Sequence, residues 1–284
     1  YRISIKELDW MGDSTKVQAQ EKLKKFRPKV GFPNEWKDYS NLVISKDDLI
    51  GNIKNSTLDR TIKNREKLGK PIDKEEWGMT PQTVNAYYSP LLNEIVFPAG
   101  ILQPPFFNME ADDAVNYGAI GAVIGHEMGH GFDDKGSKYD GNGELRNWWT
   151  ESDRKQFEER TKKLIDQYNG YTVVDGTPVN GEFTQGENIG DLAGIVIAYK
   201  AYQLSKKGSK APIIDGLTGD QRFFFGWATI WGSKSTDEQL IRQIKTDPHS
   251  PGEFRANGPL VSMPEFVNLY NIKPGDGMYI DPND

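Results

Sequence analysis

The pentapeptide HEMGH at residues 126–130 lies near the end of an apolar run that spans residues 112–131 and is rich in Gly and Ala. Two Asp residues at the start of the run and a Gly at its end favour one buried helix. Positions i and i+4 of a helix share a face, so His126 and His130 can reach one metal ion. Glu127 remains close enough to hold a metal-bound water, as in zinc-dependent hydrolases. The motif uses two of the three histidines in the chain.

A catalytic zinc site needs a third protein ligand and an open fourth position. One class of zinc enzymes places that ligand shortly after a glycine that follows the second histidine. Asp133 and Gly136 occupy the glycine and ligand positions here, which excludes that class. The other class takes a glutamate from a later helix, and Glu187 fits. Asp191 shares its helix face, so it could accept the free ring N–H of a ligand histidine and fix the tautomer.

The third histidine, His249, lies between two prolines in the segment TDPHSP at residues 246–251. Such a rigid loop could supply a hydrogen-bond donor to the oxyanion formed during hydrolysis. Arg255, six residues on, could hold a substrate carbonyl or carboxylate. Taken alone, a loop histidine is weak evidence for a catalytic role.

The composition narrows the class of protein. The chain has 284 residues, a formal net charge of −6 and no cysteine. The acidic balance argues against a nucleic-acid partner. Without cysteine, thiolate zinc sites and disulfide frameworks are excluded. No apolar run reaches ~18 residues, so no membrane-spanning segment is expected. The chain opens at Tyr1 without Met or a signal peptide, and we expect it to be a piece of a longer protein.

The overall pattern predicts an α+β fold that is mainly helical, with a small antiparallel β-sheet. Two β-like runs around a proline-containing turn, residues 83–89 and 94–97, predict a hairpin. We expect residues 1–75 to form a charged, mainly helical segment and residues 76–284 to form the catalytic domain. Further helices are expected at residues 16–26, 46–68, 187–204, 221–230 and 236–245.

The sequence resembles the C-terminal part of the neprilysin-like zinc endopeptidases (peptidase family M13), which include the endothelin-converting enzymes and bacterial oligopeptidases such as oligopeptidase O. The resemblance covers nearly the whole chain. Its most specific blocks are VNAYYS at 84–89, IVFPAGILQPPFF at 95–107, NYG at 116–118 before the HEMGH motif, GENIGD at 186–191, and residues 245–258.

The resemblance implies a thermolysin-like (gluzincin) lobe with one zinc ion per chain. It implies peptide substrates that are cut on the amino side of a bulky hydrophobic residue. It assigns zinc to His126, His130 and Glu187, the general base to Glu127, ligand orientation to Asp191, transition-state donation to His249 and substrate-backbone binding to Arg255. Asn85 and Ala86 match an edge strand that pairs with the substrate. Ile101, Phe106, Val123 and Trp231 match the pocket for the residue after the cut, although each could be ordinary core.

The family's long N-terminal portion, which builds most of a helical lobe covering the site, has no counterpart in these residues. We expect residues 1–75 to belong or link to that lobe. The lack of the cysteines found in animal members suggests a bacterial protein. We expect it to be exported, and so periplasmic, at the cell surface or extracellular. Two alternatives remain open. The chain could be a zinc-binding fragment with little turnover that serves as a structural or binding module. It could also be another zinc hydrolase such as an aminopeptidase, but no acidic motif for a free substrate amine is visible.

Overall fold

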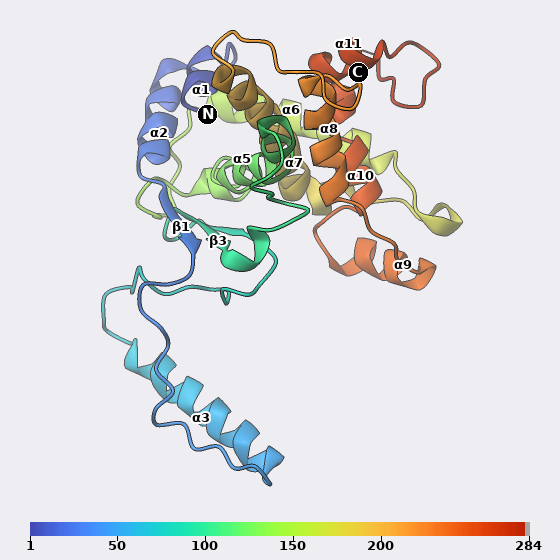
Figure 1. Cartoon of the computed structure of the whole chain (residues 1–284). Helices are drawn as coiled ribbons and strands as arrows, with labels where there is room; N and C mark the ends of the chain where they lie inside the picture. Colours follow the sequence, from blue (N-terminus) through green and yellow to red (C-terminus); the bar gives the residue numbers. More distant parts are fainter. Residues whose placement is uncertain (282–284) are drawn as a thin grey trace.

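The computed structural model describes residues 1–281 and is mainly helical (Figure 1). No helix in this range is long and apolar enough to cross a membrane. The α-helices are α1 (Arg2–Glu7), α2 (Asp13–Lys24), α3 (Leu49–Glu66), α4 (Asp113–Asn116), α5 (Ala122–Gly129), α6 (Glu151–Asn169), α7 (Gly181–Ser205), α8 (Gly219–Ile230), α9 (Asp237–Thr246), α10 (Gly252–Asn257) and α11 (Pro264–Tyr270). The strands are β1 (Arg27–Gly31), β2 (Tyr87–Ser89) and β3 (Glu94–Pro98), and short helical turns are η1 (Ala99–Ile101), η2 (Tyr117–Gly121), η3 (Gly136–Lys138), η4 (Val174–Gly176) and η5 (Leu260–Ser262).

Two apolar helices, α5 and α7, lie side by side in the centre of the molecule (Figure 1). Their backbones approach closely because glycines face each other. A Cβ on Gly125 would lie 2.7 Å from the Gly194 carbonyl oxygen, and one on Gly194 would lie 2.6 Å from the Ala122 carbonyl oxygen. Any larger residue would push the helices apart. The Gly-rich composition therefore sets the distance between the two helices that carry the candidate ligands.

Both helices differ in detail from the sequence expectation. The helix expected over residues 112–131 consists of α4, the π-helical segment η2 and α5. Helix α7 begins six residues before the expected Glu187, because Asn180 caps it and accepts a hydrogen bond from the Phe183 N–H at 2.9 Å. The 19-residue α6 was not predicted; it is highly charged and only three of its residues are buried.

The sheet is mixed, which corrects the expectation of a wholly antiparallel one. Strands β2 and β3 form the predicted antiparallel hairpin, with Tyr87 opposite Val96. Strand β1 was not predicted, since Pro28 suggested only the end of a helix. It pairs parallel to β3 in the order β1-β3-β2, and Lys29 forms a buried ion pair with Glu94 at 2.9 Å. That pairing joins residues 65 positions apart, so no local pattern indicates it.

The first 31 residues pack on the main body, but the next segment leaves it. Ile5, Met11 and Ala19 share a buried cluster with Trp148 and Trp149. Residues 32–75 extend away as an arm that carries α3 (Figure 1). None of the residues of α3 is buried.

Candidate metal centre

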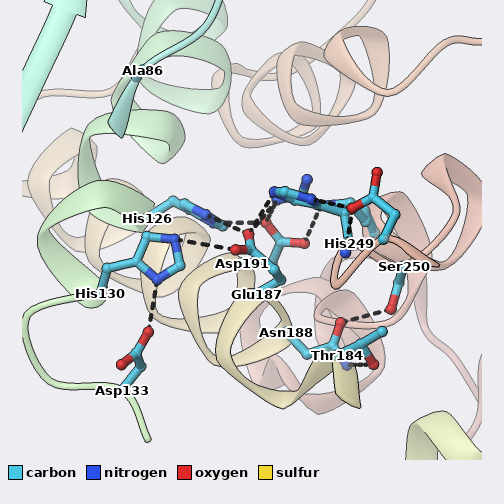
Figure 2. Close-up of polar contacts among 12 residues, drawn as sticks. Ala86, His126, His130, Asp133, Thr184, Glu187, Asn188, Asp191, His249 and Ser250 are labelled. Atoms are coloured by element: carbon cyan, nitrogen blue, oxygen red, sulfur yellow. Dashed lines mark hydrogen bonds and ion pairs between the residues drawn. The ribbon is translucent and has the colours of Figure 1, made fainter. Parts of the chain in front are cut away.

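His126, His130 and Glu187 each offer a donor atom, and these atoms lie within 4.8 Å of one another. His126 Nε2 lies 3.2 Å from Glu187 Oε2, and His130 Nε2 lies 3.7 Å from Glu187 Oε1. A tetrahedral zinc ion with bonds of ~2.0–2.1 Å holds its ligand atoms roughly 3.3 Å apart. Among the residues described, this is the only such group of three. The two imidazoles meet edge to face because α5 places them one turn apart (Figure 2).

The protonation behaviour of the group fits a cation site. Burial alone would raise the pKa of Glu187, but its contacts with His126 and His249 and the charge of His130 outweigh burial and hold that pKa well below its ordinary value. Glu187 Oε2 is buried without a well-aligned hydrogen bond. Burial would lower the pKa of His126, but Asp191 and Glu187 raise it to about 10. Without a metal, His126 is therefore protonated on both ring nitrogens, and zinc binding would release one of these protons.

Asp191 lies where the sequence expects it. Its Oδ1 is 2.8 Å from His126 Nδ1, so the ring N–H donates to the carboxylate and Nε2 faces the metal position. Arg255 donates to both Asp191 oxygens, from Nε and Nη2, each at 2.7 Å. Burial would raise the pKa of Asp191, but Arg255 outweighs it and keeps the group ionised. Arg255 was predicted to bind substrate; in the structure its guanidinium binds Asp191, the residue in contact with His126.

Asp133 has a corresponding contact with His130, which the sequence analysis missed. Its Oδ2 lies 2.8 Å from His130 Nδ1, and its Oδ1 accepts the N–H groups of Lys135 and Gly136 at 2.8 and 2.6 Å. The carboxylate is therefore held by the loop after α5 and faces the ligand ring (Figure 2). Its position three residues after His130 was the available signal.

Glu127, the candidate base, and His249, the candidate transition-state donor, both interact with the proposed ligands. Glu127 is buried, and burial raises its pKa against the opposing effect of His126. His249 Nε2 lies 3.1 Å from Glu187 Oε2, and its Nδ1 lies 2.6 Å from Asp247 Oδ1. The contact with Glu187 raises the pKa of His249 against its burial.

The predicted substrate-binding residues divide into two groups. Ala86, Ile101, Phe106 and Val123 belong to one apolar cluster beside β2, with Ala86 and the exposed Asn85 just before that strand. Strand β2 is at the edge of the sheet. Trp231 instead packs on Trp227 in the core around α8, with Arg255 4.0 Å above its ring. The structure therefore brings together three of the four predicted pocket residues and leaves Trp231 in a different cluster.

A cavity of about 230 Å³ borders the ligands His130 and Glu187, and Tyr88, Phe183 and Pro248 line it further out. A larger cavity of about 410 Å³ lies between α1, α2 and α7. None of the candidate metal ligands lines the larger one. The smaller cavity therefore offers a route from solvent to the metal position.

Several known proteins are similar to this chain in sequence and in structure. The profile of peptidase family M13 matches residues 85–284. Neprilysin-3 of Drosophila melanogaster is 39% identical over 98% of this chain and 37% of its own length, and endothelin-converting enzyme 1 of Homo sapiens is 40% identical over 97% of this chain and 37% of its own length. The structure of Mycobacterium tuberculosis zinc metalloprotease Zmp1 in complex with an inhibitor matches with a TM-score of 0.97 at 55% identity, and that of PepO from Lactobacillus rhamnosis with 0.90 at 35%. Both structural matches cover 100% of this chain and 44% of the other protein, so this chain spans less than half the length of each relative.

Proposed function

This chain belongs to peptidase family M13, and we propose that it carries the catalytic centre of a zinc metalloendopeptidase. The observation that supports this most directly is the convergence of His126, His130 and Glu187 from α5 and α7, with donor atoms within 4.8 Å. We propose these three residues as the ligands of one zinc ion. Asp191 and Asp133 hold the two imidazoles so that each Nε2 faces the metal position.

A zinc ion at this position would polarise the peptide carbonyl and lower the pKa of a bound water. Glu127 accepts the proton of the attacking water and then delivers it to the leaving amine. Its raised pKa suits both roles, because a base must also be able to return the proton. His249 donates from Nε2–H to the carbonyl oxygen as that oxygen becomes negative.

We further propose that the substrate lies along the edge of β2. An unpaired strand edge can accept an extended peptide as an added strand, with Asn85 and Ala86 contacting the substrate main chain. Ile101, Phe106 and Val123 form an apolar surface next to Ala86. A bulky hydrophobic side chain after the cut would bury its surface there, which supports cleavage on the amino side of such residues.

We propose that residues 32–75 belong to a covering lobe supplied mainly by an N-terminal portion of a longer protein. Five large apolar residues of α3 are 46–71% exposed: Leu49, Ile50, Ile53, Leu58 and Ile62. A helix with that much exposed apolar surface normally has a partner. The packing of the first 31 residues on the main body argues for a boundary near residue 32 rather than at residue 75.

The test of function is peptide cleavage followed by mass spectrometry, with zinc-loaded protein, with chelated protein and with zinc restored. We expect cuts before Phe or Leu that the chelator abolishes and zinc restores. Glu127→Gln serves as the matched control against a contaminating protease, because it should keep the ligands and lose turnover. Stoichiometric zinc without chelator-sensitive cleavage would instead favour the alternative of a zinc-binding module with little turnover.

The covering lobe has its own test. The comparison is between this chain and a longer form that carries the N-terminal portion, on a short peptide and on an unfolded protein. An open groove admits water and weakens electrostatic stabilisation, so this chain should cut more slowly and with little size limit. Equal rates on the short peptide, with rejection of the unfolded protein by both, would contradict the proposal.

We also propose that the protein is exported from a bacterial cell, to the periplasm, the cell surface or the medium. The support is the similarity to bacterial proteins of the same family. Fractionation of the source cells would test it, and recovery only with the cytoplasm would contradict it.

A further inference from the structure

The loop of residues 247–251, called the His249 loop here, is joined to α7 by a buried hydrogen-bond chain. The Ser250 hydroxyl donates to Asn188 Oδ1 at 2.8 Å, and Asn188 Nδ2 donates to Thr184 Oγ1 at 2.9 Å (Figure 2). All three residues are about 1% exposed. None of them contributes a metal ligand, a base or a transition-state donor. These hydrogen bonds therefore have a role other than direct participation in the chemistry.

Asn188 and Ser250 are each adjacent in sequence to a candidate functional residue. Asn188 follows the candidate ligand Glu187 on α7, and Ser250 follows His249. A bond between Asn188 and Ser250 therefore limits how far His249 can move from Glu187. His249 Nε2 lies 3.1 Å from Glu187 Oε2, and the His249 side chain is 44% exposed, so it has little packing of its own to hold it there.

The Asp247 N–H donates to the Gln243 carbonyl oxygen at 2.8 Å, which joins the start of the His249 loop to α9. The other attachments of the loop are weaker or lie further along the chain. Gln243 of α9 reaches the His249 carbonyl oxygen at 3.3 Å, near the long end for a hydrogen bond. The His249 N–H and Nδ1 both contact Asp247, which belongs to the same loop and cannot anchor it. Arg255 attaches α10 to Asp191, five residues beyond Ser250. Ser250 is thus the buried side-chain anchor closest to His249.

We propose that Asn188 and Ser250 are positioning residues that hold His249 where its Nε2–H can meet the reacting carbonyl oxygen. The proposal rests on the function proposed above for His249. Loss of an oxyanion donor costs about 10²–10³ in kcat. A misplacement of ~1 Å can cost 10²-fold. A loop that is loosened but still visits the right position should lose less, about 10-fold.

The test is a double-mutant cycle on the zinc-loaded protein with Ser250→Ala, His249→Ala and the combination. Ser250→Ala should lower kcat about 10-fold, with KM and zinc content near those of the parent. In the His249→Ala background it should change kcat by less than about twofold, since no donor remains to be positioned. Asn188→Ala should behave like Ser250→Ala and provides a second route if one variant folds poorly.

Thr15→Val is the matched control. Thr15 of α2 is also fully buried and hydrogen-bonded, but to Asp153 of α6, and α2 lies across the molecule from α9 and α10 (Figure 1). Its loss should lower stability without changing kcat. If it reduces kcat as much as Ser250→Ala does, the effect is general destabilisation and the proposal is wrong.

Hydrogen exchange separates the positioning step from catalysis. Ser250→Ala should speed deuterium uptake in the His249 loop and leave the α5 amides unchanged. Unchanged uptake in the loop, or equal losses of kcat in the parent and His249→Ala backgrounds, would overturn the inference while leaving the proposed function intact. No turnover by the parent, or no effect of His249→Ala, would instead overturn the proposed role of His249 and the inference with it.

Discussion

Asp133→Asn tests whether the contact of Asp133 with His130 controls zinc affinity. The Asn side chain has nearly the same shape, and its oxygen can still accept the N–H groups of Lys135 and Gly136, now 2.8 and 2.6 Å from Asp133 Oδ1. Its NH₂ group then faces His130 Nδ1, where Asp133 Oδ2 lies at 2.8 Å. Two donors cannot pair, so the ring is driven to the tautomer with hydrogen on Nε2, which cannot bind a metal.

The expected loss of zinc affinity can be estimated because the substitution changes only the contact with His130. Loss of a carboxylate that orients a ligand histidine typically reduces metal affinity 10–100-fold, which corresponds to about 1.4–2.7 kcal/mol. The zinc-free protein should keep its melting temperature within a few degrees, because both backbone amides retain an acceptor. Asp133→Ala should in addition destabilise the zinc-free protein, by about 1–3 kcal/mol for each amide left unpaired.

The assay is competition for zinc against a chromophoric chelator, together with thermal unfolding of the zinc-free protein. Asp134→Asn is the matched control: it removes the same charge from the next position, and Asp134 Oδ1 is buried with no hydrogen-bond partner. If Asp133→Asn keeps the parent affinity, the contact with His130 has no role in metal binding. If Asp134→Asn loses as much affinity, the effect is the removed charge and the orientation argument is wrong.

Glu127→Gln should keep stoichiometric zinc and lose turnover; loss of zinc, or cleavage at the parent rate, would contradict the role of base. Glu187→Ala should release zinc to ordinary chelators, and tight zinc binding in that variant would identify a different third ligand. Burial would raise the pKa of Asp153, but hydrogen bonds from Thr15 and the Gly12 N–H hold it below its ordinary value. That stabilisation is present above the unfolded pKa of ~3.9 and is lost as the pH falls through the lower folded value. In denaturant titrations, the free energy of unfolding of Asp153→Asn should therefore decrease less steeply below about pH 4 than that of the parent. An unchanged pH dependence would exclude Asp153 as a source of it.

The helices with clear local patterns could be predicted from the sequence. The β2–β3 hairpin and the helices ending near residues 131 and 205 follow from alternation, caps and apolar composition. Strand β1 could not be predicted, because its pairing depends on β3, 65 positions away, and on the buried Lys29–Glu94 ion pair. Helix α6 was not predicted because it is highly charged, although Thr150 caps it and Phe157, Leu164 and Tyr168 recur at helical spacing.

By itself the sequence determined the candidate ligand set. His126 with His130, and Glu187 with Asp191, are spaced i and i+4, and helix geometry places such pairs on one face whatever surrounds them. Tertiary structure alone decided the contact of Asp133 with His130 and that of Ser250 with Asn188. Asp133 lies beyond the end of α5, where no regular geometry fixes its direction. The Ser250–Asn188 bond joins residues 62 positions apart, which only the packing of α10 and the His249 loop against α7 brings together. Local spacing can specify a shared helix face, but contacts between separate elements depend on how the whole chain packs.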